Sequence, residues 1–130
     1  MTTLDGLIDA NIIIDSLRGY TPAQQWILQN QTLTLGLLSL VRMEIVFGTQ
    51  NKVELQKIGS VLNNYPLIYP NETDAKWAME QFEKFHLSNR IEIVDCFLAA
   101  TSLRLSVPIY TRNQRDFRVF PSVVAIIPYS

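Results

Sequence analysis

The segment LIDANIII (residues 7–14) contains the pattern from which the fold of this chain can be predicted. Its first two residues, Leu7 and Ile8, form a short apolar run that is typical of a buried strand. Asp9 interrupts this run, and apolar residues then recur at helical spacing from residue 12 to residue 17. A strand that leads directly into a helix is the building unit of an α/β protein.

The same alternation of short apolar runs and helical patterns continues along the chain. We expect strands at residues 7–8, 33–38, 67–69, 109–110 and 123–127, and helices at residues 12–17, 22–29, 40–47, 53–62, 73–85 and 94–105. Pro22 suits a first helical turn, and Ser39 is a candidate N-cap. These elements predict a three-layer α/β/α sandwich with a mostly parallel central sheet, in a single domain over residues 1–130.

The composition excludes several classes of function. The chain has one cysteine, Cys96, and one histidine, His86, so it lacks an internal disulfide and a thiolate zinc site. A Ser/His/Asp or Cys/His arrangement would need His86, which lies in a polar helical stretch without a nucleophile motif. The N-terminus does not resemble a secretion signal, and no apolar run approaches the roughly 20 residues of a membrane span. We therefore expect a cytoplasmic protein that does not enter a membrane.

The charge is unevenly distributed. The formal net charge is −1, which is not the basic excess of a protein that grips nucleic acid by bulk electrostatics. Residues 101–130, however, contain four arginines and a single acid, Asp116, and so carry a net charge of +3. One acid is therefore expected in basic surroundings.

Two acids of the first half of the chain occupy unusual positions. Asp9 follows the first strand, at the edge of a parallel sheet where ligands bind, although it could also simply cap the next helix. Glu44 lies in LVRMEIVF (residues 40–47), where its helical neighbours are apolar. An unpaired buried charge is costly, so Glu44 either meets a partner or metal, or reaches water from the helix edge.

Two further acids occur near the C-terminus. Asp95 is the only charge in IVDCFLAAT (residues 93–101), which has the composition of a buried helix, and it could also act as the N-cap of that helix. Asp116 lies in a polar turn after the strand at residues 109–110, where a solvated loop aspartate is the alternative interpretation.

Carboxylates that converge at strand ends and buried helix starts would repel one another if all were ionised. A divalent cation would relieve this repulsion. Because hard oxygen ligands without Cys or His companions favour Mg²⁺ or Mn²⁺, the sequence predicts one or two such ions held by Asp9, Glu44, Asp95 and Asp116.

Four segments that contain these acids resemble motifs of the PIN-domain family, and in particular its VapC-like toxins. LIDANIII (residues 7–14) is similar to the opening Asp-x-Asn motif, and LRG (residues 17–19) to the segment that follows it. SLVRMEIVFG (residues 39–48) resembles the segment with the central Glu. DCFLAAT (residues 95–101) resembles Asp-x-x-Ile-Ala-Ala-Thr, and YTRNQRDF (residues 110–117) resembles Thr-x-Asn-x-x-Asp-Phe.

The resemblance implies a metal-dependent endoribonuclease, usually a homodimer, that is the toxin of a toxin–antitoxin pair and is inhibited by a small antitoxin. On this hypothesis Asp9 and Asp95 are the main metal ligands, and Glu44 and Asp116 complete the site. Side chains that orient the carboxylates and water by hydrogen bonds would be those of Asn11, Thr111 and Asn113. Phosphates of the RNA substrate would be contacted by Arg112 and Arg115.

Two other interpretations remain open. The same acids could serve a magnesium-dependent phosphatase or a DNA nuclease, although a phosphatase would be expected to carry an acid where this chain has Asn11. The chain could also be a regulatory or binding module without catalysis, with Trp26 and Trp77 on a partner surface, although aromatic residues at helical spacing usually belong to a core.

Overall fold

The computed structural model describes residues 3–130 and shows an α/β fold with a central sheet of five parallel strands. The strand order is β3-β2-β1-β4-β5, and every neighbouring pair is parallel. The strands are β1 (Gly6–Ile8), β2 (Leu35–Leu38), β3 (Leu67–Ile68), β4 (Ile109–Tyr110) and β5 (Ala125–Ile126). The predicted α/β sandwich with a parallel sheet is confirmed.

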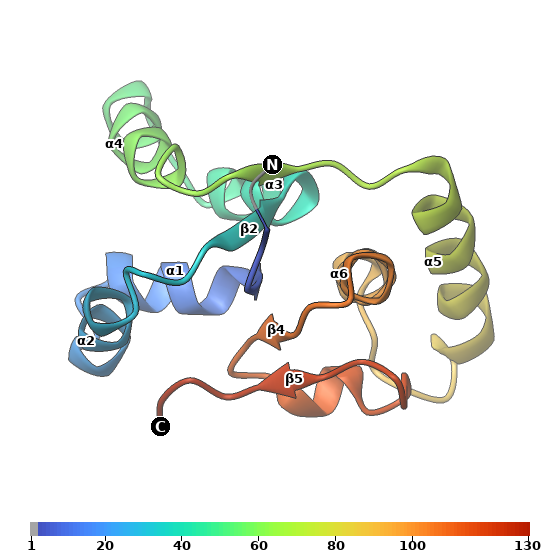
Figure 1. The fold of residues 1–130 in the computed structure, drawn as a ribbon. Coiled ribbons are helices and arrows are strands. Elements are labelled where there is room, and N and C mark those ends of the chain that lie inside the picture. The colour runs from blue at the N-terminus through green and yellow to red at the C-terminus, as the bar shows by residue number, and fades with distance from the viewer. Residues whose placement is uncertain (1–2) are drawn as a thin grey trace.

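The helices cover both faces of this sheet (Figure 1). They are α1 (Ala10–Leu17), α2 (Thr21–Gln29), α3 (Ser39–Phe47), α4 (Lys52–Leu62), α5 (Glu72–Phe85) and α6 (Ile93–Leu105), with a short 3-10 helix η1 (Gln114–Phe117). Helices α1 and α2 lie on one side of the strands, and α5 and α6 lie on the other (Figure 1). None of the helices described combines the length and apolar character needed to cross a membrane.

All predicted elements occur, and the limits that differ do so by one or two residues. Each helix begins earlier than predicted. Except in α6, which begins at Ile93, the added residues are polar or small and precede the apolar pattern. Pro22 lies in the first turn of α2 as predicted. Ser39 is not an N-cap: Leu38 occupies that position, and Ser39 is already the first helical residue of α3. The 3-10 helix η1 forms where a polar turn was predicted.

The core consists of the apolar strand residues and the inner faces of α1, α3 and α6. Leu7, Ile8, Leu37 and Ile109 have no exposed surface, as is typical of central parallel strands covered on both faces. Helix α6 buries residues around most of its circumference, including Cys96, Leu98 and Ala99, so it is the helix that lies deepest in the molecule. The polar groups at the start of α6 are thus fixed by a rigid element.

An ion pair joins helices α5 and α6. Asp74 is 3% exposed, and both of its carboxylate oxygens accept hydrogen bonds from Arg104 Nε, at 3.1 and 2.9 Å. Asp74 also belongs to a capping box with Asn71 at the start of α5. The carboxylate therefore fixes the start of one helix against the end of the other.

Replacement of this arginine is expected to destabilise the protein. In Arg104→Gln the buried carboxylate of Asp74 loses its cation, which typically costs about 3 kcal/mol when one partner of a buried pair is removed. Urea denaturation would measure the change in the free energy of unfolding, with Lys76→Gln on the exposed side of α5 as the control. Equal stability of the two variants would contradict the structural role of the pair.

Candidate metal centre

Asp9 lies at the carboxyl end of β1, where the sheet register places it beside the residue that follows β4. Leu7 pairs with Ile109 and Ile8 with Tyr110, so the next residues along, Asp9 and Thr111, are neighbours. The backbone N–H of Asp9 donates to the carbonyl of Tyr110 at 3.0 Å. The side chain is 7% exposed, and its Oδ1 accepts a hydrogen bond from the Ala10 N–H at 2.7 Å. Asp9 thus caps α1, which was the alternative interpretation of this residue. Its other oxygen, Oδ2, lies against Thr111, the residue that follows β4.

A hydrogen-bonded group of three segments holds the second oxygen of Asp9. The hydroxyl of Thr111 donates to Asp9 Oδ2 at 2.8 Å, and Asn11 Nδ2 lies 3.2 Å from Thr111 Oγ1 and 3.5 Å from Asp9 Oδ2. Asn113 contributes its backbone N–H, which donates to Thr111 Oγ1 at 3.0 Å. The structure therefore places Asn11 and Thr111 in direct contact with the Asp9 carboxylate, and Asn113 one contact further away.

Loss of the Thr111 hydroxyl is expected to weaken both the fold and the site. Thr111 has no exposed surface, so Thr111→Val removes a donor to a buried carboxylate and an acceptor for two N–H groups. We expect a loss of about 1–3 kcal/mol in the free energy of unfolding, measured by urea denaturation. Thr111→Ser keeps the hydroxyl and should recover most of this loss. If the valine and serine variants are equally stable, the hydrogen bond to Asp9 is unimportant.

Asp95 lies in the first turn of α6, on the side that faces the sheet edge. It is 7% exposed, and its Oδ2 accepts a hydrogen bond from the backbone N–H of Glu92 at 3.1 Å. Glu92, not Asp95, is the N-cap of α6. Asp95 therefore takes part in capping as the third residue of the helix. The interpretation of Asp95 as the N-cap itself is wrong, because Glu92 occupies that position.

The other two predicted acids are less buried. Glu44, on α3, and Asp116, on η1, both have intermediate exposure. Glu44 is therefore on the border of the apolar face of α3, and η1 holds Asp116 in a folded turn that lies against α6 and β5. Both keep one side open to solvent.

The pKa values of these acids are raised, chiefly by burial and in part by one another's charge. Burial raises the pKa of Asp95 to about 7, and repulsion from the carboxylates of Asp9 and Asp116 acts in the same direction. Burial likewise raises the pKa of Asp9 above its ordinary value, in spite of the hydrogen bonds from Thr111 and Ala10. Glu44 follows the same trend, because burial raises its pKa and the charge of Asp9 adds to the effect.

The pKa of Asp116 is also raised, by burial, although the adjacent charge of Arg115 lowers it. The structure therefore brings Asp9, Asp95 and Asp116 within electrostatic range of one another at the carboxyl edge of the sheet, and Glu44 within range of Asp9.

Glu92 is a fifth acid of this group, and our sequence analysis assigned it no role. It is exposed, and its charge raises the pKa of Asp9, Glu44 and Asp95. The sequence does contain a signal for it: an acid three residues before Asp95, immediately ahead of an apolar helix, is the spacing of a capping box. The start of α6 thus supplies two acids to the same region.

The chemistry of this donor set fits Mg²⁺ or Mn²⁺. All of the donors are carboxylate oxygens, and their raised pKa values show that the ionised forms are destabilised where no cation is present. Within residues 3–130, no three His, Cys, Asp or Glu side chains form a ready-made cage for an ion. Magnesium commonly binds through only one or two carboxylates and keeps several waters, so an open arrangement of this kind is suitable for it.

Arg112 and Arg115, the predicted phosphate contacts, have different surroundings. The guanidinium of Arg112 donates to Asp15 Oδ2 at 2.8 Å and lies over the rings of Tyr20 and Tyr129, at 5.4 and 5.5 Å from their centroids. The side chain of Arg115 is exposed next to Asp116. Arg112 therefore ties the loop after β4 to α1 and the C-terminal residues, whereas Arg115 is available to a ligand.

The single cysteine is unsuited to nucleophilic chemistry. Cys96 has no exposed surface, and burial raises the pKa of its thiol to about 11. The tryptophans named for the binding-module alternative are both partly buried against the core, where Trp26 packs on Tyr110 and Trp77 on Phe120.

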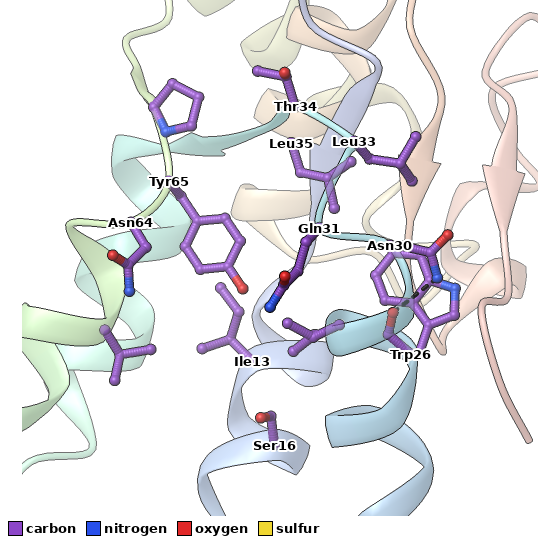
Figure 2. Close-up of a pocket in the computed structure, with 13 residues that line it drawn as sticks. Ile13, Ser16, Trp26, Asn30, Gln31, Leu33, Thr34, Leu35, Asn64 and Tyr65 are labelled. Carbon is purple, nitrogen blue, oxygen red and sulfur yellow. Dashed lines mark hydrogen bonds between the residues drawn. The ribbon is translucent and has the colours of Figure 1, made fainter.

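A separate hollow of about 620 Å³ lies at the opposite edge of the sheet. It is bordered by the residues that precede β2 and β3 and by α1, α2 and the end of α4. Figure 2 shows Tyr65 and Asn64 facing Trp26 and Asn30 across this hollow, with Ile13 between them. No aspartate or glutamate lines it, so it is not part of the acidic group.

The fold and the acidic group define an α/β protein with a carboxylate site at the carboxyl edge of a parallel sheet. No family model and no curated protein sequence match the chain. Solved structures do match it, beginning with a chain of a toxin–antitoxin complex from Klebsiella pneumoniae, with a TM-score of 0.75, 21% identity, and coverage of 96% of this chain and 98% of that one.

Two further solved structures are similarly close. VapBC-1 from nontypeable Haemophilus influenzae matches with a TM-score of 0.77, 20% identity, and coverage of 95% and 97% of the two chains. FitAcB from Neisseria gonorrhoeae matches with a TM-score of 0.73, 21% identity, and coverage of 95% and 97%. The chain therefore has the PIN-like fold of VapC-type proteins over almost its whole length.

Proposed function

We propose that the chain is a Mg²⁺- or Mn²⁺-dependent endoribonuclease and acts as the toxin of a toxin–antitoxin pair. The observation that carries this proposal is the group of acids at the carboxyl edge of the sheet, where burial, and in addition the charge of neighbouring acids, raises the pKa of Asp9, Glu44 and Asp95. Capping accounts for Asp9 and Asp95 one at a time, but it does not account for placing several like charges in one region, which opposes their ionisation. The PIN-like fold, shared with chains of toxin–antitoxin complexes, supports the same assignment.

In this proposal Asp9 and Asp95 hold the cation, and Glu44 and Asp116 complete its surroundings. A divalent cation held by these residues would supply a water of lowered pKa and would offset negative charge on the phosphate oxygens. Thr111 and Asn11 fix the orientation of the Asp9 carboxylate through their hydrogen bonds. Each Asp9 oxygen thus has a fixed donor, the Ala10 N–H for one and the Thr111 hydroxyl for the other.

The test is a comparison of substrates with the purified protein. Single-stranded RNA, single-stranded DNA and a small phosphate ester are incubated with Mg²⁺ or Mn²⁺ and with EDTA. The proposal expects internal cleavage of RNA that EDTA abolishes. Cleavage of DNA alone would indicate the DNA nuclease alternative, ester hydrolysis alone a phosphatase, and no reaction with any substrate together with no metal binding by calorimetry would indicate a binding module.

We also propose that the chain binds a small antitoxin protein in the cytoplasm and forms a homodimer. Similar chains are described as parts of toxin–antitoxin complexes, and the hollow of Figure 2 offers apolar side chains to a segment of the antitoxin.

The homodimer is supported by a second surface. On α3, Met43 and Phe47 lie one turn apart and are 62% and 90% exposed, as expected of an interface between copies. Light scattering of the free chain, and co-purification with the product of an adjacent short gene, would test these two proposals.

A further inference from the structure

A polar groove of about 870 Å³ opens directly beside the acidic group. One wall is the segment between α5 and α6, and the other is the segment from η1 to the residues that follow it. Glu92 and Asp116 lie in the lining, so the groove and the candidate metal centre share two residues. The groove is also lined by His86, Asn89, Arg90, Asn113, Arg115 and Arg118.

The three arginines of this groove are exposed, and none of them forms an ion pair within residues 3–130, although Arg115 lies next to Asp116. Within residues 3–130 the ion pairs are Asp74 with Arg104 and Asp15 with Arg112. Arg90, Arg115 and Arg118 therefore form no ion pair in the part of the chain that the structure describes. The three arginines outnumber the two acids of the lining, Glu92 and Asp116, in a chain whose net charge is −1. This local excess of guanidinium groups favours a negatively charged ligand, more so where a cation neutralises the acids.

The guanidinium group also indicates the kind of anion. Its planar fork of N–H donors matches the oxygens of a phosphate and can bind two of them at once. Because three such groups line an open groove and not a closed pocket, they suit successive phosphates of a chain better than a single small phosphate ester.

The other lining residues suit unpaired bases. The ring of His86 is exposed and is braced by stacking on Phe82, with 5.2 Å between the centroids and 15° between the planes. Single-stranded nucleic acids stack their bases on such rings, and side-chain amides like those of Asn89 and Asn113 can bond to base edges.

We propose that this groove binds single-stranded RNA, with Arg90, Arg115 and Arg118 on its phosphates and His86 under a base. The inference rests on the proposed function for the identity of the nucleic acid, and it assigns substrate binding to Arg90, Arg118 and His86 in addition to Arg115. It also separates the groove from Arg112, whose guanidinium is already held by Asp15 and two tyrosine rings.

The test measures binding separately from cleavage. Fluorescence anisotropy with a short labelled single-stranded RNA is recorded for the chain in EDTA, and again with Mg²⁺ in the Asp95→Asn background. Arg90→Gln and Arg118→Gln are each expected to weaken binding about fivefold and to lower the slope of log K against log salt by about 0.7. Arg18→Gln, an exposed arginine at the opposite end of α1 from Asp9, is the matched control and should bind as the unmodified chain does.

The histidine is tested by a pair of variants. His86→Ala should weaken RNA binding about tenfold through loss of stacking, whereas His86→Phe should retain most of it. An alanine variant that binds as well as the phenylalanine variant would remove His86 from the groove's function.

Several outcomes would overturn the proposal. The first is undetectable RNA binding in both conditions, and the second is unchanged affinity in both arginine variants. The third is displacement of the RNA by polyglutamate as effectively as by unlabelled RNA, which would indicate a site that binds any negatively charged polymer. If the groove does not bind RNA, metal-dependent cleavage of RNA can still be observed, so this result is distinguishable from failure of the proposed function. Arginine-dependent binding without any cleavage would retain the groove and reject the nuclease.

Discussion

Asp95→Asn is expected to abolish RNA cleavage and, at the same time, to make the metal-free protein more stable. Cleavage should fall by at least about a hundredfold, because asparagine supplies one neutral oxygen where the proposed site has a charged ligand. Stability should rise because burial and the charges of Asp9 and Asp116 oppose ionisation of Asp95. Asparagine keeps an acceptor for the Glu92 N–H, so the start of α6 should be preserved.

Both effects can be measured on the same preparation. RNA cleavage with Mg²⁺ or Mn²⁺ gives the first, and the thermal midpoint in EDTA at neutral pH gives the second. Glu80→Gln, an exposed acid on α5, removes the same charge away from the site and should change neither quantity. Retention of full cleavage by Asp95→Asn would reject Asp95 as a metal ligand. A lower thermal midpoint would show that its charge is structurally required.

The order and type of the elements could be predicted because the sequence changes period at each one. Short apolar runs with no polar face, such as residues 35–38, occur where the structure has strands buried on both sides. The residues at which the helices begin were harder to predict from the sequence. Helix α5 begins at Glu72, before its first apolar position, because Asn71 and Asp74 bond to each other's backbone N–H groups.

The positions of the four acids were also predictable, because a charge next to or within an apolar segment is conspicuous. Their proximity was a consequence of topology: β1 and β4 are neighbours, so Asp9 and Thr111 meet although 102 residues separate them. The environment of an exposed side chain could not be predicted in this way. Arg112 and Arg115 are three residues apart in one polar turn, yet one is held by Asp15 and two tyrosine rings and the other is free of ion pairs among the described residues.

Asp95 is expected to make a contribution to the free energy of unfolding of the metal-free protein that decreases as the pH rises. The folded-state pKa of about 7 lies above the ordinary value of 3.8 for an aspartate, so between these values the folded chain binds more protons than the unfolded chain. Stabilisation from this group is therefore complete below about pH 4 and is lost as the pH rises through about 7. Each pKa unit corresponds to about 1.4 kcal/mol, so the contribution amounts to a few kcal/mol.

A bound divalent cation should reverse this trend, because it stabilises the ionised carboxylates that high pH creates. Urea denaturation between about pH 5 and pH 8, with EDTA and with saturating Mg²⁺ or Mn²⁺, should show little effect of metal at the acidic end and a large stabilisation at the basic end. Other groups also titrate in this range, so the contribution of Asp95 is the difference between the unmodified chain and Asp95→Asn. That difference should narrow as the pH falls, and metal should stabilise the variant far less. Metal binding depends on the protonation of Asp95 only if this carboxylate is part of the metal site. If the metal stabilises the protein equally at both ends of the pH range, or stabilises both proteins equally, the ion is bound away from Asp95.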